Sequence, residues 1–189
     1  MADQTTSGFT RRGLLAVFTA TAVTAAPYYA NASGFLRRGG DIRRLSMYSG
    51  RTGERFDAVY WIDGNYVPEV LREISFFMRD WRNNEVKAID TRCLDMMCAA
   101  HRLLDASEPY NLLSGYRSPA TNRMLRARSR NVAQNSLHLT GKAADLRLRS
   151  RSVSQMSRAA TALNAGGVGR YSRSDFVHMD CGPVRSWGA

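Results

Sequence analysis

His138, Asp145 and His178 are the residues that most constrain how this chain can fold. His138 and Asp145 are seven residues apart on either side of Gly141, and His178 follows 33 residues after Asp145 in a short, β-like run. A glycine permits a left-handed or tight backbone between two such residues. If the three side chains bind one metal ion, the fold has to bring a loop and a distant strand together.

Two histidines and one carboxylate are typical of an open zinc site. Catalytic zinc usually takes three protein ligands of these types and leaves a fourth position for water. Cys181 follows His178 by three residues, and this odd spacing on a strand points the two side chains to opposite faces. We therefore expect Zn²⁺ at His138, Asp145 and His178. The alternative is purely structural, with a helix-cap aspartate, a surface histidine and a buried histidine.

Two further segments accompany the Ser-x-His-x-x-Gly-x-Ala-x-Asp pattern of residues 136–145. Residues 114–122 read Ser-Gly-Tyr-Arg-Ser-Pro-Ala-Thr-Asn, and residues 177–185 read Val-His-Met-Asp-Cys-Gly-Pro-Val-Arg. With these three segments in this order, the chain resembles the zinc D-Ala-D-Ala metallopeptidases and their murein endopeptidase K-like relatives. The resemblance extends from about Leu45 to Trp187.

The resemblance implies a role for each matching residue. His138, Asp145 and His178 correspond to the family's zinc ligands. Arg117 corresponds to an arginine that stabilises the developing oxyanion or holds the substrate. The family's general base is commonly a glutamate three residues before the last histidine ligand, and this chain has Asp175 at that position.

The identity of the base is open between two aspartates. Asp175 is one methylene shorter than glutamate, so its carboxylate has to lie closer to the metal-bound water. Asp180 shares a strand face with His178, from which it could act on the water or orient the imidazole. We favour Asp175.

Three residues beside these motifs are candidates for substrate binding: Ser136, Ser118 and Tyr116. The Ser136 hydroxyl can hydrogen-bond to the loop backbone or to a substrate terminus. Ser118 is also the predicted N-cap of a helix that starts at Pro119. Tyr116 closes a predicted buried strand.

The chain after its amino terminus is long enough for one domain. We expect an α+β fold with a small, mostly antiparallel sheet, helices on one face and the zinc site on the open face, as in D-Ala-D-Ala peptidases and Hedgehog-like domains. Alternation over 58–66 around Asp63-Gly64 predicts a β-hairpin, and apolar spacing predicts helices over 68–81 and 91–105. Further predicted elements are strands near 112–116 and 143–148, a strand or pair of strands over 168–179, and helices near 119–127 and 153–163.

The amino terminus predicts export to the periplasm. Residues 10–15 form a twin-arginine pattern, the apolar segment 14–26 is too short to span a bilayer comfortably, and residues 30–32 fit a small-x-small cleavage site. The expected organisation is a twin-arginine signal peptide over 1–32, a flexible linker over 33–44 and a zinc peptidase domain over 45–189. An uncleaved signal that anchors the chain transiently in the membrane is the alternative.

The charge balance favours an anionic partner. The formal net charge is +11 at pH 7 and the pI is about 10.3, which attracts polyanions over a long range. After export these are cell-wall and envelope polymers. Nucleic acid is not expected, because the sequence contains no recognisable nucleic-acid-binding module. We expect a monomer that binds peptidoglycan stem peptides.

The resemblance implies a zinc-dependent murein endopeptidase that hydrolyses peptide crosslinks in peptidoglycan, with the D-Ala to meso-diaminopimelate bond as the first expectation. One alternative is a related zinc peptidase, either a D-Ala-D-Ala carboxypeptidase or an L-Ala-D-Glu endopeptidase. Another is a peptidoglycan-binding module without catalysis.

Overall fold

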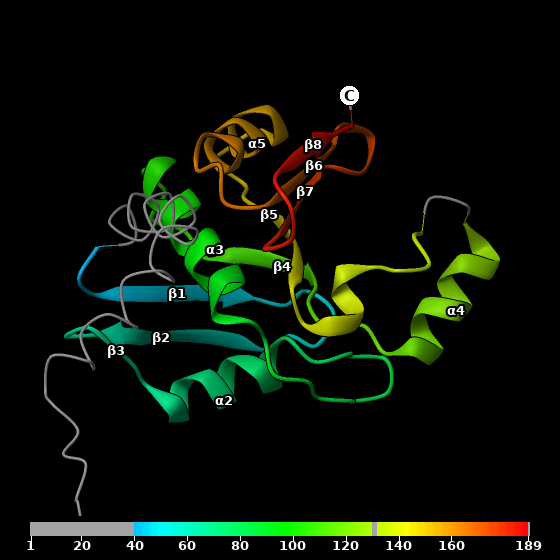
Figure 1. Ribbon diagram of the computed structural model, residues 1–189, viewed down its shortest axis with the longest axis horizontal. Coiled ribbons are helices and arrows are strands. Elements are labelled where there is room, and N and C mark those ends of the chain that lie inside the picture. Colours follow the sequence, from blue (N-terminus) through cyan, green and yellow to red (C-terminus); the bar gives the residue numbers. More distant parts are fainter. Residues whose placement is uncertain (1–39, 130–131, 189) are drawn as a thin grey trace, which may run out of the picture.

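A computed structural model describes residues 40–129 and 132–188 of this chain. The expected signal peptide, and the expected linker up to residue 39, lie outside the described residues. The described part contains four α-helices and one eight-stranded sheet (Figure 1). Among these residues there is no helix with the length and apolar character needed to cross a membrane.

The sheet is mixed, and it is larger than the sequence predicted. Its strands lie in the order β3-β2-β1-β4-β5-β7-β6-β8. The pairs β1–β4 and β6–β8 are parallel, and the other five pairs are antiparallel. The expected small, mostly antiparallel sheet is therefore only loosely matched, because the sheet has eight strands and two of its pairs are parallel. The strand bounds are Arg43–Tyr48 (β1), Arg55–Ile62 (β2), Asn65–Tyr66 (β3), Tyr110–Ser114 (β4), Ala143–Arg147 (β5), Gly167–Tyr171 (β6), Phe176–Asp180 (β7) and Arg185–Trp187 (β8).

Strand β1 was not predicted, and it begins inside the expected linker. Arg43 and Arg44 read as polar linker residues in the sequence. In the structure the Arg43 side chain is buried, and its Nη1 lies 2.7 Å from Oδ1 of Asp95. A long-range ion pair thus makes burial of this arginine possible, which no local pattern indicates.

The predicted β-hairpin is confirmed. Strands β2 and β3 pair antiparallel, with Trp61 opposite Tyr66 and Ile62 opposite Asn65. The two turn residues both have positive φ, 50° at Asp63 and 80° at Gly64. Asp-Gly favours such a turn because both residues adopt this conformation more readily than most.

The four predicted helices are confirmed, with bounds Pro68–Phe77 (α2), Thr91–Leu103 (α3), Pro119–Arg128 (α4) and Val153–Ala162 (α5). Helix α2 ends four residues before the predicted end. Its C-cap Met78 uses its carbonyl to accept the backbone N–H of Tyr116, and the backbone then turns to pair Asp80 with Glu85. A contact with a distant segment therefore ends the helix.

One hydrophobic core lies between the sheet and three of the helices. Residues of α2, α3 and α5 contribute to this core, whereas α4 contributes none and extends to the side in Figure 1. On β5 and β7 the core residues are Ala144, Leu146, Val177 and Met179. Because side chains alternate along a strand, Asp145 and His178 project from the opposite face. The metal-ligand candidates therefore lie on the face away from the core, as expected.

Candidate metal centre

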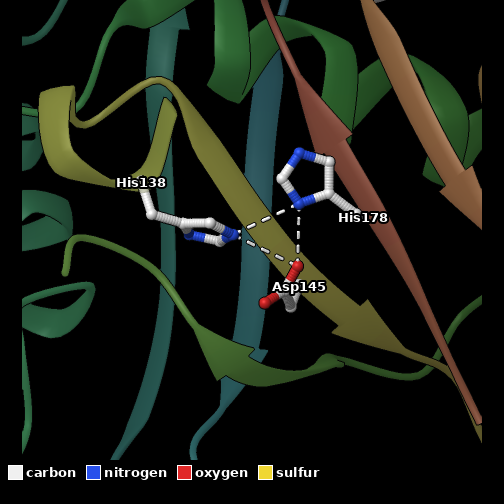
Figure 2. Close-up of side chains that lie close together, drawn as sticks. All are labelled: His138, Asp145 and His178. Carbon is white, nitrogen blue, oxygen red and sulfur yellow. Dashed lines mark hydrogen bonds and ion pairs between the residues drawn. The ribbon is translucent and has the colours of Figure 1, made fainter. Parts of the chain in front are cut away.

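Three side chains from separate elements, His138, Asp145 and His178, point toward one another in Figure 2. Oδ1 of Asp145 lies 2.9 Å from Nδ1 of His178 and 3.2 Å from Nε2 of His138. The two imidazole nitrogens are 3.2 Å apart. In the described part of the chain, these three residues form the one group of histidine, cysteine and acidic side chains placed to share a metal ion.

Backbone register and one tight turn place these side chains. Asp145 on β5 is directly opposite His178 on β7 in the antiparallel ladder. His138 lies on the short 3₁₀ helix η1 (Leu137–Thr140), which ends at Gly141 with φ of 67°. A Cβ atom at Gly141 would also collide with the carbonyl oxygen of Ala88. Glycine is therefore required by both conformation and space.

Both imidazoles are oriented by a hydrogen bond on the side away from Asp145. Nδ1 of His138 donates to the carbonyl of Gly115 over 2.7 Å, which leaves Nε2 to face Asp145. Nε2 of His178 donates to Oδ2 of Asp180 over 3.0 Å, which leaves Nδ1 to face Asp145. Such partners fix the tautomer and ring direction of metal-binding histidines.

The three converging atoms fit a zinc ion. Zinc–nitrogen and zinc–oxygen bonds of about 2.0–2.1 Å in a tetrahedron place ligand atoms roughly 3.3 Å apart. The observed separations of 2.9 to 3.2 Å are close to this value. Two imidazole nitrogens and one carboxylate oxygen are also a donor set that zinc accepts, with one position left for water.

The surroundings of Asp145 and His178 favour the ionised carboxylate and the protonated imidazole. Burial raises the pKa of the Asp145 carboxyl, but attraction to His138 and hydrogen bonds with both imidazoles outweigh it and hold this pKa well below its usual value. Burial lowers the pKa of His178, but its bonds to Asp145 and Asp180 prevail and raise it to about 9. A metal ion that binds near neutral pH therefore has to displace the proton of His178.

Arg117 lies beside the three converging side chains. Its Nη2 is 3.7 Å from Oδ2 of Asp145, and its backbone N–H donates to the carbonyl of His138. The side chain is 12% exposed and lines the same cavity of about 350 Å³ as the three candidate ligands. A cation at this place can hold negative charge that develops next to the metal group.

Comparison with known proteins identifies the family. Residues 37–187 match the family described as "Peptidoglycan L,D-endopeptidase MepK". The chain belongs to this family. It is 42% identical over 145 residues to the protein of that name from Escherichia coli (strain K12), which covers 77% of this chain and 80% of the relative. It is 36% identical over 146 residues to a "Probable peptidoglycan L,D-endopeptidase MepK" from Haemophilus influenzae, covering 77% and 78%. The expected kinship with murein endopeptidases is confirmed.

In this MepK-family chain, both carboxylate oxygens of Asp180 have hydrogen-bond partners. Its side chain is wholly buried and bonds to Nε2 of His178, to the backbone N–H groups of Gly167 and Gly182 and to both terminal nitrogens of Arg185. Burial raises its pKa, but these bonds prevail and hold the pKa far below the usual range. Of the two roles that the sequence left open, this environment fits orientation of His178.

Asp175 lies at the rim of the cavity. Its carboxylate is 65% exposed, and Oδ2 is 3.1 Å from Nε of Arg147. The neighbours Ser174 and Phe176 line the cavity, but Asp175 itself does not. The structure therefore does not bring the Asp175 carboxylate into the group formed by the three candidate ligands.

The three candidate substrate-binding residues differ in placement. Ser136 is partly exposed and lines the cavity. Ser118 is wholly buried and does not line it; its hydroxyl accepts the Thr121 N–H as the N-cap of α4 and also bonds to Asn83. Tyr116 is buried away from the cavity as well. The structure thus places Ser118 and Tyr116 outside this cavity, in capping and in the core. That either residue contacts a substrate stays a prediction.

Aromatic residues that the sequence analysis did not single out form one wall of the cavity. The rings of Tyr171 and Phe176 stack with centroids 4.5 Å apart, and Nε1 of Trp187 donates to the Tyr171 hydroxyl over 3.1 Å. The Trp187 ring lies 5.3 Å from that of His178. Phe176 precedes His178 by two residues on β7, so strand alternation could have placed it on the same face.

Proposed function

We propose that this protein is a zinc-dependent peptidoglycan endopeptidase of the periplasm. The observation that carries the proposal is the convergence of His138, Asp145 and His178, whose free ligand atoms face one another at the side of a cavity. Membership of the MepK family supports peptidoglycan as the substrate. The basic charge of the chain supports an anionic polymer as the partner.

Each residue has a distinct part in the proposed hydrolysis. His138, Asp145 and His178 would hold the zinc ion, which when bound would supply an acidified water and polarise the scissile carbonyl. The Arg117 guanidinium stabilises negative charge on that carbonyl oxygen. We assign the general base to Asp175, whose carboxylate has to leave Arg147 and turn from the rim toward the water.

The descriptions of the two relatives suggest which peptide bond this protein hydrolyses. These proteins are described as L,D-endopeptidases, whereas the D-Ala to meso-diaminopimelate bond that the motifs first suggested joins two D-centres. We therefore propose a bond between an L- and a D-centre. L-Ala-D-Glu has this stereochemistry. A direct link between two diaminopimelates can have it too, since each meso residue carries one centre of each configuration.

The shape of the cleft supports an endopeptidase over a carboxypeptidase. The cavity beside the metal group and a second cavity of about 490 Å³ share Arg117, Asp145, Ser174 and Phe176. The two cavities therefore adjoin at Asp145. A peptide with chain on both sides of the scissile bond fits such a cleft, whereas a carboxypeptidase needs a pocket that ends at the free carboxylate.

The proposal is tested by digestion of purified, crosslinked peptidoglycan. The enzyme is the protein purified after export, used with and without added zinc. Products are separated by chromatography and identified by mass spectrometry. We expect new termini at an L,D bond with zinc, and none with His138→Ala. The control His101→Ala removes the remaining histidine, which binds the Glu108 carbonyl outside the site, and should retain activity. Bound zinc without any product would instead favour the non-catalytic binding module.

A twin-arginine export route is the part of the proposal that depends on residues outside the described structure. Arg11 and Arg12 form the pattern on which it rests. Replacement of both by lysine should keep the protein in the cytoplasm, as measured by cell fractionation. Unchanged export would rule this route out.

A further inference from the structure

A second cavity beside the metal group is lined by four arginines. Arg51, Arg82, Arg117 and Arg147 line this space of about 490 Å³, and Asp145 is the one acidic residue that lines it. The Asp145 carboxylate is already bound by the two imidazoles. Arg147 is paired with Asp175 at the rim, and the other three arginines leave an excess of positive charge next to the site.

Much of this positive charge is weakly neutralised. Nη1 of Arg82 lies 3.9 Å from Asp80, at the limit of an ion pair, and in the described residues Arg51 forms no ion pair. Both guanidinium groups instead lie over the Trp81 ring, at 5.5 Å for Arg51 and 4.2 Å for Arg82. Burial lowers the pKa of Arg82; attraction to Asp80 opposes this, and repulsion from Arg117, Arg51 and Arg128 adds to it.

Two buried polar atoms of the lining residues are unpaired. Within the described part of the chain, Nε of Arg117 and Oδ1 of Asn111 are buried without a hydrogen-bond partner. Buried polar atoms of this kind are uncommon, because each one left without a partner destabilises the folded protein. Nε of Arg117 needs an acceptor and Oδ1 of Asn111 needs a donor. A peptide supplies both in its carboxylate and amide groups.

We propose that the cavity lined by Arg51, Arg82, Arg147 and Asn111 is a subsite for a carboxylate of the stem peptide next to the bond that is cut. This inference rests on the proposed function. The cavity adjoins the metal-side cavity at Arg117 and Asp145, so a peptide bound across the metal group can reach both. Guanidinium groups are well suited to carboxylates, because they donate parallel hydrogen bonds and stay charged.

The two directions of the cleft thus differ in chemistry. On one side lie the aromatic rings of Tyr171 and Trp187, and on the other lie the arginines. A peptide with its free carboxylate on one side of the scissile bond can therefore bind in one direction only. The arginine cavity sets the orientation of the substrate.

The test measures binding separately from cleavage. Soluble stem peptides are prepared in pairs that differ in one carboxylate, free or amidated, with a pair for each carboxylate. Their dissociation constants are measured by calorimetry on the full-length exported protein in a His138→Ala background, which prevents hydrolysis and leaves the arginine cavity intact, since His138 does not line it. If His138→Ala destabilises the protein, His178→Ala is a second inactive background, because His178 does not line the arginine cavity either.

One free carboxylate should tighten binding by roughly ten- to a hundredfold, the range expected for charge-assisted hydrogen bonds. Arg82→Gln and Arg51→Gln should each remove most of this preference. The matched control is Arg123→Gln, which removes the same charge at an exposed position outside the cavity and should retain the preference. Equal affinity for every free and amidated pair would overturn the subsite.

Failure of the two proposals can be told apart. If the carboxylate preference depends on Arg82 but the wild-type protein with zinc cuts no peptidoglycan, the subsite stands and the proposed catalysis fails. If the wild-type protein cuts peptidoglycan while free and amidated peptides bind equally, the catalysis stands and the subsite is wrong.

Discussion

His178 donates its Nε2–H to Oδ2 of Asp180 over 3.0 Å, on the side of the ring opposite Asp145. The two residues are two positions apart on β7 and therefore share one face of the sheet. Asp180 is itself held by Arg185 and by two backbone N–H groups. The position of this carboxylate decides which nitrogen of His178 faces the metal group.

Asp180→Asn should weaken zinc binding without changing the ligands. Asparagine keeps the shape but removes the charge that holds His178, and loss of such a partner typically costs about 10- to 100-fold in metal affinity. Competition with a chromogenic chelator measures the affinity. Asp175→Asn is the matched control and should bind zinc as the wild type does. Equal affinities in the two variants would contradict the orienting role.

Asp175→Asn should lower kcat by about 10²-fold or more, the usual size of a general-base contribution, while zinc affinity stays unchanged. Arg147→Gln is the companion variant. It releases the Asp175 carboxylate from its ion pair and should retain or raise kcat, while KM rises because Arg147 also lines the arginine cavity. Steady-state hydrolysis of soluble muropeptides provides the measurement. Full activity of Asp175→Asn would exclude this residue as the base.

The metal-free protein should lose stability as pH rises from about 6.5 to 9. The pKa of His178 is raised to about 9 in the folded state, against about 6.5 in an unfolded chain. Folding therefore favours the protonated ring, and this stabilisation is complete below the unfolded pKa and lost as pH rises through the folded one. It amounts to at most about 3–4 kcal/mol, at roughly 1.4 kcal/mol per pKa unit.

Urea unfolding at pH 6, 7.5 and 9, with and without zinc, measures this dependence. Zinc binds the neutral ring, so the zinc-bound protein should show the opposite trend, with weaker stabilisation by zinc at low pH. A metal-free free energy of unfolding that is constant from pH 6 to 9 would show that His178 does not hold its proton as inferred.

Gly141→Ala should destabilise the protein more than Gly53→Ala. Both glycines have positive φ, 67° and 75°, so each alanine pays about 1–2 kcal/mol for the left-handed conformation. A Cβ atom meets nothing within 4 Å at Gly53 but collides with the Ala88 carbonyl at Gly141. Denaturant unfolding should therefore show a loss of about 1 kcal/mol at Gly53 and clearly more at Gly141. Equal losses would mean that the Gly141 turn can shift freely.

The local elements could be predicted because their signals lie within a few residues. Asp63-Gly64 specifies the hairpin turn, and Ser118 before Pro119 starts α4. Strands β1 and β8 were missed, since their pairing depends on distant partners. The Arg43–Asp95 ion pair spans 52 positions, and no local pattern predicts a buried arginine there.

The sequence by itself determined the candidate ligands and the faces they occupy. Alternation on β5 and β7 sends Ala144 and Val177 to the core and Asp145 and His178 to the other face. The tertiary structure alone decided which aspartate orients His178, that Asp175 pairs with Arg147, and that arginines from separate segments line one cavity. The physical reason is range: strand alternation and turn preferences act between neighbours, whereas burial, ion pairing and cavity shape depend on residues that only folding brings together.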